Sequence, residues 1–257
     1  MSISGQAGVG KIRLFNDFCG PEIPVANGVA YGTTAGGCNY YLGDFTVRGD
    51  LGETDTGIVD LEKSSGWVRI GYNDEDAAGI WVGTGLSFSP ALNGTMVVEA
   101  RVEHRALTTK NAFIGFIGTL VDNTAEIITN TTTTCTRAGN AVGFMFDSQI
   151  TINTVAATCC YHMPYMISTT TSQVATAIAS SQIIVAAEAD ILRVEIDPDG
   201  AARWYMNGKL EQSIGAVLAA DVSTLMAGGV GCWGTTTTDS DLDVDYLLVE
   251  ANRDWTR

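Results

Sequence analysis

Apolar and polar residues alternate one by one in several stretches of this chain, and no other feature restricts its fold as strongly. In residues 95–104, Val98, Ala100 and Val102 would point to one side of an extended strand, and the charged residues between them to the other. The same alternation returns in residues 190–197 and 241–248. Such a period is typical of antiparallel strands with one buried face, whereas a helical period is nearly absent. The pattern therefore predicts an all-β fold.

Short apolar runs bounded by turn residues predict further strands. They span residues 67–70, 80–82, 112–117, 142–146, 203–206 and 226–233. Two turn sequences are typical of hairpins, namely Asp-Pro-Asp-Gly at 197–200 and Asn-Gly at 207–208. Because these turns separate three predicted strands, we expect two consecutive hairpins between residues 190 and 214.

Two regions lack the strand period. Residues 1–60 are rich in glycine, and we expect an irregular N-terminal arm there. Residues 61–257 should form an antiparallel β-sandwich that is interrupted by a threonine-rich long loop insertion at about 119–185. A length of 257 residues suits one large sandwich domain.

The charge of the chain restricts its partners. The sequence has 29 acidic and 14 basic residues, which gives a formal net charge of -15. Because this charge repels nucleic acid phosphates and anionic lipids, we expect neither nucleic acid nor a membrane as a partner. No stretch approaches the roughly 20 apolar residues that a bilayer-spanning helix needs, and the N-terminus lacks the pattern of an export signal.

The cysteines do not form the pattern of a disulfide framework or of a zinc site. Six cysteines are scattered along the chain without a Cys-x-x-Cys pair, and only two histidines accompany them. We therefore expect reduced thiols in a protein made in a cytoplasm. The cysteines are Cys19, Cys38, Cys135, Cys159, Cys160 and Cys232.

Residues 190–214, DILRVEIDPDGAARWYMNGKLEQSI, resemble the strand-turn-strand-turn-strand segment of laminin G-like and concanavalin A-like jelly rolls. Residues 67–88, 95–104 and the closing LDVDYLLVEANR at 242–253 are similar to that superfamily as well. The opening RLFNDFCG at 13–20, followed later by GWVRI, resembles head and tail proteins of marine phages. The resemblance implies a concanavalin A-like jelly roll that belongs to a phage particle.

A catalytic carboxylate pair is the strongest enzymatic possibility in this sequence. Glucanases of the resembled fold carry a Glu-x-Asp-x-Glu strand whose carboxylates flank the bond that is cleaved. Here Glu195 and Asp197 are followed by Pro198, so that Asp199 falls in a turn instead of on the strand. We expect no catalytic residues and no enzymatic activity, and a glycan hydrolase with a different carboxylate pair is the remaining enzymatic hypothesis.

Two further motifs are incomplete. GQAGVGK at 5–11 has the glycine and lysine spacing of a phosphate-binding loop, but Ile12 replaces the required hydroxyl residue and no strand precedes the loop. In Cys159-Cys160-Tyr161-His162, adjacent residues of a strand point to opposite faces, and no acidic residue lies nearby to orient the imidazole. We interpret the first as part of the arm and the second as structural.

Two acidic segments raise the question of calcium. Asp239, Asp241, Asp243 and Asp245 would lie on one strand face, and residues 73–76 form a second acidic group. A linear strand face does not make its oxygens converge on one ion. We therefore interpret the aspartate series as a solvated edge that discourages aggregation, and expect no metal and no cofactor.

The five tryptophans occur mainly within apolar strands, which favours a place in the core. They are Trp67, Trp81, Trp204, Trp233 and Trp255. Two of them, Trp204 and Trp233, are candidates for stacking on a sugar ring, as in lectins of the resembled fold.

The leading functional hypothesis is a capsid decoration (cement) subunit, a structural protein of the virion that contacts the major capsid protein and copies of itself as a trimer. The alternative is a carbohydrate-binding module of a phage tail or fibre that recognises host surface glycan. Apolar residues outside the strand period are the expected partner contacts. They are Ile12, Leu14, Phe15, Ile127, Ile128, Tyr161, Met163, Tyr165 and Met166.

Overall fold

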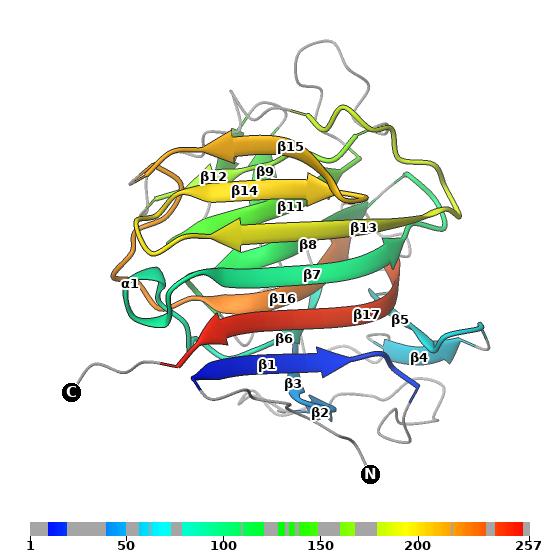
Figure 1. Cartoon of the computed structure of the whole chain (residues 1–257). Coiled ribbons are helices and arrows are strands. Elements are labelled where there is room, and N and C mark those ends of the chain that lie inside the picture. Colours follow the sequence, from blue (N-terminus) through cyan, green and yellow to red (C-terminus); the bar gives the residue numbers. More distant parts are fainter. Residues whose placement is uncertain are drawn as a thin grey trace.

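Two antiparallel β-sheets face each other in the computed structural model of this chain (Figure 1). The residues described are 10–19, 40–49, 57–61, 63–72, 79–108, 110–120, 128–131, 134–136, 139–148, 160–167, 179–216, 218–234 and 240–253. Within them the one helix is the short α1 (Pro90–Asn93). The predicted all-β sandwich is confirmed.

The first sheet has eight strands in the order β15-β14-β13-β7-β17-β5-β4, with β1 also paired to β17. Their bounds are β15 Lys209–Ile214, β14 Ala202–Met206, β13 Ala189–Ile196, β7 Met96–Glu103, β17 Ser240–Asn252, β5 Trp67–Tyr72, β4 Gly57–Leu61 and β1 Lys11–Asn16. Strand β17 is long enough to pair with β5 through its first half and with β1 through its second half. The first and last described strands thus lie side by side (Figure 1).

The second sheet has seven strands in the order β12-β11-β8-β16-β6-β3-β2. Their bounds are β12 Tyr165–Met166, β11 Ala141–Asp147, β8 Lys110–Ile117, β16 Ala227–Gly234, β6 Gly79–Gly83, β3 Phe45–Gly49 and β2 Tyr40–Leu42. A separate hairpin joins β9 (Thr129–Thr131) and β10 (Thr134–Thr136).

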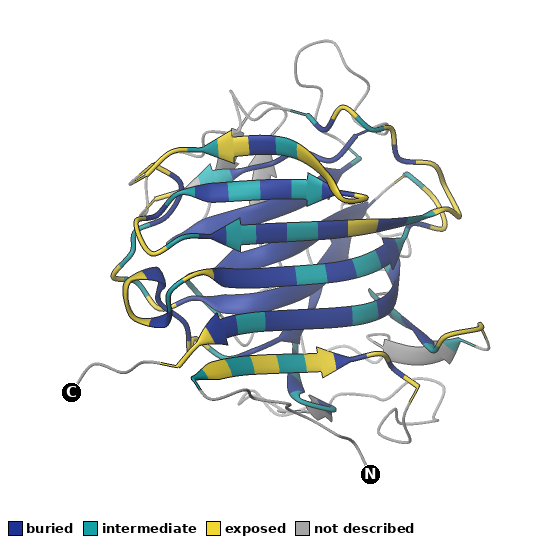
Figure 2. Cartoon of the chain, viewed as in Figure 1, coloured by how far each residue is buried: buried dark blue, intermediate teal, exposed yellow. Residues whose placement is uncertain are grey.

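The alternation read from the sequence corresponds to alternating burial in the eight-stranded sheet. Val98, Ala100 and Val102 of β7 are fully buried between the sheets, and their charged neighbours lie on the outer face. Strand β13 repeats the pattern with Leu192 and Val194 inside (Figure 2). The predicted half-buried strands are therefore confirmed for β7 and β13.

The central strands of the seven-stranded sheet are buried on both faces. All residues of β8, β11 and β16 are buried, and alternate side chains of these strands contribute to two different apolar clusters. Phe113, Met145 and Trp233 belong to the outer cluster, whereas Ile114 and Phe144 belong to the core between the sheets. Near-continuous apolar strands are what burial of both faces requires.

The region 1–60, expected to be an irregular arm, contains four strands that belong to the two sheets. β1 and β4 extend the eight-stranded sheet, and β2 and β3 extend the seven-stranded sheet. The partner of β1 lies far away in the sequence, so this pairing leaves no local turn signal. Most of the loop-like motif at 5–11 lies outside the described residues.

No helix in the described part of the chain is long and apolar enough to cross a bilayer.

Candidate ligand-binding groove

An open groove of about 570 Å³ lies on the outer face of the eight-stranded sheet. It is formed by β7, β13 and β14 and by the turn that joins β14 to β15. The lining residues are Glu99, Ile191, Arg193, Glu195, Tyr205, Asn207 and Gly208. A volume of this size falls within the range of small-ligand sites.

Strand register brings the central residues of the groove together. Glu99 of β7 lies opposite Arg193 of β13, and Arg193 lies opposite Tyr205 of β14. Because residues two apart on a strand share a face, Ile191 and Glu195 flank Arg193 along the groove. The sheet therefore presents the half-buried phenol ring of Tyr205 beside the charged side chains of Glu99, Arg193 and Glu195.

Hydrogen bonds hold the charged groups of the groove in place. The Arg193 guanidinium donates to Glu195 Oε1 from Nε at 2.8 Å and to Glu99 Oε2 from Nη1 at 3.2 Å. The Tyr246 hydroxyl donates to Glu99 Oε1 at 2.8 Å, and Arg203 Nε donates to Glu195 Oε2 at 3.0 Å. Burial and the bond to Glu99 raise the pKa of Tyr246, so the phenol keeps its proton. Both carboxylates are thus oriented before any ligand arrives.

The predicted Asn-Gly hairpin turn closes one end of the groove. Asn207 and Gly208 have positive φ angles of 51° and 79°, as a two-residue turn of the mirror-image type requires. The Asn207 side chain accepts a hydrogen bond from the Ile191 amide at 2.9 Å and donates to Asp190 at 2.9 Å. These bonds fix the amide at the groove rim.

The carboxylates weighed as a catalytic pair are held by arginine. Arg203 donates to Asp197 Oδ1 at 2.9 Å and to Oδ2 at 2.5 Å, in addition to its bond to Glu195. Hydrogen bonds from Arg203 hold the pKa of Asp197 below its usual value, which works against a role as general acid. Strand β13 ends at Ile196, and Asp199 in the following turn accepts a bond from the Ala201 amide. Glu195 and Asp197 therefore share one guanidinium, and Asp199 does not continue their row.

The aspartate series of β17 is not the solvated edge that we expected. β17 is an inner strand between β7 and β5, and Asp243 is 0% exposed. A register shift between Val244 and Tyr246 leaves Asp245 without a partner in β7, but Asp245 still lies on the outer face with Asp243, where it accepts a bond from Arg101. A bulge of this kind leaves no signal in the period of the sequence.

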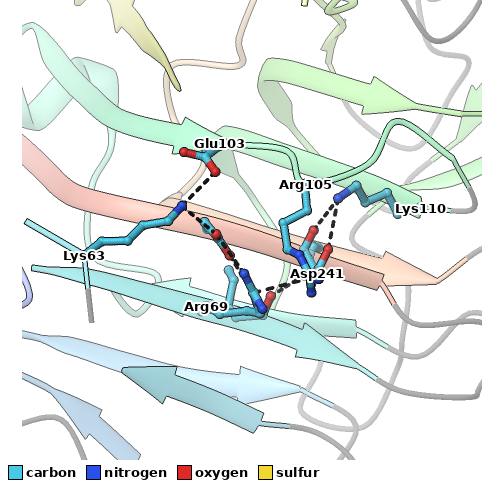
Figure 3. A network of polar contacts seen from close by, with 9 residues as sticks. Lys63, Arg69, Glu103, Arg105, Lys110 and Asp241 are labelled. Atoms are coloured by element: carbon cyan, nitrogen blue, oxygen red, sulfur yellow. Dashed lines mark hydrogen bonds and ion pairs between the residues drawn. The ribbon is translucent and has the colours of Figure 1, made fainter. Parts of the chain in front are cut away.

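Basic residues neutralise the buried Asp243. Arg69 donates to it from Nε at 2.6 Å and from Nη2 at 3.0 Å, and the Lys63 ammonium donates at 3.1 Å. The hydrogen bonds to Asp243 raise the pKa of Arg69, whose charge is thereby favoured. Lys63 also bonds Glu103 at 2.7 Å, which links β7, β17 and the segment before β5 (Figure 3).

A second group of charges surrounds Asp241. The Lys110 side chain is 1% exposed, and its Nζ donates to the Asp241 carbonyl at 2.6 Å and to the carboxylate at 3.2 Å. Arg105 donates to the same carboxylate at 3.1 Å (Figure 3). Asp241 and Asp243 therefore both form ion pairs with lysine and arginine side chains. No three metal-ligating side chains gather at one point in the described ranges, and Asp239 and residues 73–76 lie outside them.

Neither candidate for sugar stacking has a ring face at the surface. Trp204 is 0% exposed between the sheets, and its indole nitrogen donates to the Gly143 carbonyl at 2.9 Å. Trp233 is buried in the outer cluster of the seven-stranded sheet. The stacking role is wrong for both residues, because Trp204 packs into the core between the sheets and Trp233 into the cluster that covers the outer face of the seven-stranded sheet.

The residues expected to contact a partner have several different environments. Ile128, Tyr161 and Met163 are fully buried and serve the core, because the chain itself covers them. Ile12, Leu14 and Tyr165 pack partly buried against the core. Phe15 is 44% exposed, and its ring lies 5.9 Å from that of Tyr246. Ile127 and the side chain of Met166 lie outside the described residues.

The cysteine and histidine segment shows no reactive pair within the described residues. Among the described residues, Cys19, Cys160 and Cys232 form no disulfide, and Cys160 and Cys232 are buried while Cys19 is exposed. Burial lowers the pKa of His162 to about 4, so its imidazole is neutral at pH 7. Cys159 lies outside the described residues.

The groove itself was not predicted from the sequence. Its signal was present in Tyr205, an aromatic residue on the outward face of a strand that ends in an Asn-Gly turn. The neighbour in β7 could not be found in this way, because β7 and β13 are far apart in the chain.

No protein-family model matches the chain, and no curated protein sequence matches it. A protein of unknown function from Shewanella oneidensis MR-1 is similar in structure, with 13% identity, a TM-score of 0.58, and coverage of 99% of this chain and 92% of that one. The carbohydrate recognition domain of Emp46p in its potassium-bound form is 8% identical, with a TM-score of 0.50 and coverage of 80% and 87%. These likenesses show the fold alone, and the chain is a concanavalin A-like jelly roll similar to lectin-type domains.

Proposed function

We propose that this chain is a lectin-type domain that binds a short glycan in the groove over β7, β13 and β14. The observation that carries the proposal is the half-buried Tyr205 ring beside carboxylates that are already oriented by hydrogen bonds. The likeness to a carbohydrate recognition domain is consistent with this function.

The groove offers the two kinds of contact that a sugar needs. A sugar ring has an apolar face of C–H groups, which packs against an aromatic ring, and hydroxyl groups at its rim, which need polar partners. Tyr205 and Ile191 supply apolar surface, and Glu99, Glu195 and Asn207 supply acceptors and an amide. Because other bonds fix these side chains, little conformational entropy is lost when the glycan binds.

Replacing Tyr205 with alanine should weaken glycan binding about tenfold or more, equivalent to about 1.4 kcal/mol. The loss follows from removal of the ring on which the sugar packs. Tyr205→Phe should keep most of the affinity, because the ring face remains. The measurement is titration calorimetry with a glycan chosen from an oligosaccharide array.

Phe15→Ala is the matched control, since it removes an exposed aromatic ring on β1, outside the groove. It should bind the glycan as the parent does. Equal affinity of the parent and of Tyr205→Ala would place the sugar elsewhere and contradict the proposal, as would the absence of any bound glycan on the array.

The role in the virion is a second proposal, in which the chain decorates a phage capsid as a trimer and contacts the major capsid protein. The exposed Phe15 on β1 favours a protein contact there, because aromatic residues are enriched in interface cores. The Phe15→Ala variant, added to particles assembled without this protein, should occupy about tenfold fewer binding sites than the parent does. The Tyr205→Ala variant should bind these particles as the parent does. Unchanged occupancy of the Phe15 variant, or failure of the parent to bind particles, would contradict this role.

A further inference from the structure

We infer that the groove selects neutral glycans and rejects acidic ones such as uronic acid oligomers. This inference rests on the proposed glycan-binding function and names the substrate class of the same site. It follows from the charges that line the groove and from the bonds in which they are engaged.

The groove carries an excess of negative charge. Its lining contains two carboxylates, Glu99 and Glu195, and one guanidinium, Arg193. That guanidinium lies between the carboxylates and bonds both, so its charge is already neutralised within the protein. A carboxylate on the ligand would have to compete with two protein carboxylates for this cation.

Among the described residues around the groove, the next basic side chains, including Lys209, each have a carboxylate partner. Arg203 is engaged by Glu195 and Asp197, and Arg101 by Asp245 at 2.7 Å. Each arginine around the groove thus has a carboxylate partner. The formal net charge of -15 on the whole chain further disfavours the approach of polyanions.

The same carboxylates are suited to hydroxyl donors. An ionised carboxylate has about four acceptor positions, and the described bonds use only some of them on Glu99 and Glu195. A neutral sugar supplies hydroxyl groups as donors to the remaining positions. Charge-assisted bonds of this kind are stronger than bonds between neutral groups.

The test uses matched trisaccharides that differ only in oxidation at C6, made from glucose, galactose or mannose and from the corresponding uronic acids with the same linkage. Affinities are measured by titration of the full chain at low salt and at 0.5 M salt. For any pair that binds, we expect the neutral trisaccharide to bind at least about fivefold more tightly than the uronate at low salt. The preference should shrink at high salt, because the screening length falls below about 5 Å.

Glu99→Gln tests the cause of the preference, since it removes one negative charge from the groove and keeps a side chain of the same shape. The uronate should then bind the Glu99→Gln variant at least about threefold more tightly than it binds the parent. The ratio of the affinities for the neutral sugar and the uronate should therefore decrease. Asp17→Asn is the matched control, because it changes the net charge equally at an exposed position next to β1. It should leave the preference unchanged.

The outcomes separate the inference from the function on which it rests. Uronates that bind as tightly as the neutral sugars, or a preference that does not change with salt, would overturn the inference while glycan binding stands. Binding of no array glycan and of no trisaccharide would overturn the proposed function itself. If Glu99→Gln does not fold, the salt dependence of the parent still decides the inference.

Discussion

Replacing Trp204 with alanine is expected to lower the free energy of unfolding by about 3–5 kcal/mol, as for other large aromatic residues in packed cores. Trp204 is fully buried between the two sheets, and its ring lies 6.2 Å from that of Tyr165. The substitution would leave a cavity and would also leave the buried Gly143 carbonyl without its indole donor. Chemical denaturation followed by circular dichroism measures the change.

Leu92→Ala is a suitable control, because Leu92 is an exposed apolar residue and its truncation should change stability by less than about 0.5 kcal/mol. Trp204→Phe should lower the free energy of unfolding by an amount between those of Leu92→Ala and Trp204→Ala, since it keeps most of the ring and loses the hydrogen bond. A Trp204→Ala variant as stable as the parent would mean that the ring is not a core element. It would also reopen the sugar-stacking hypothesis.

Asp241→Ala is expected to destabilise the fold by about 3 kcal/mol, because it leaves the buried Lys110 ammonium without a carboxylate. Lys110→Met should change stability by less than about 1 kcal/mol, since Arg69 and Arg105 still neutralise Asp241. The asymmetry arises because a lone buried charge is much less favourable than an apolar side chain of similar volume. Denaturant unfolding of both variants and of the parent gives the comparison.

The double variant Lys110→Met with Asp241→Ala provides the control. Without the buried ammonium, the loss of Asp241 should be much less damaging than in the single variant, and the difference is the coupling energy of the pair. Additive effects, with no recovery in the double variant, would contradict the role of Asp241 in neutralising Lys110.

The sequence alone was sufficient for the fold class and for the two hairpins between residues 190 and 214. The alternation in β7 and β13 predicts which side chains face the core, and the Asn207-Gly208 turn predicts where β14 ends. These are local properties, because the period of two and the turn geometry depend on neighbouring residues only. The apolar runs that form β8 and β11 were also recognisable as strands from the sequence.

Long-range pairing was not accessible in the same way. Strand β1 pairs with β17 at the other end of the chain, and nothing near Lys11–Asn16 indicates that partner. The bulge in β17 between Val244 and Tyr246 likewise leaves no local signal in the sequence. Burial of Trp204 and Trp233 depends on which strands stack above them, which the period within one strand does not report.

The amino-acid sequence by itself determined strands β5–β8, β11 and β13–β17, the hairpin turns, the sandwich class and the acidic character of this protein. Only the tertiary structure decided that the β17 aspartates are neutralised by Lys63, Arg69, Arg105 and Lys110, and that Glu99, Arg193 and Tyr205 form one groove. The physical reason is that strand period is a local property, whereas charge neutralisation and groove formation depend on the register between strands that are distant in the chain.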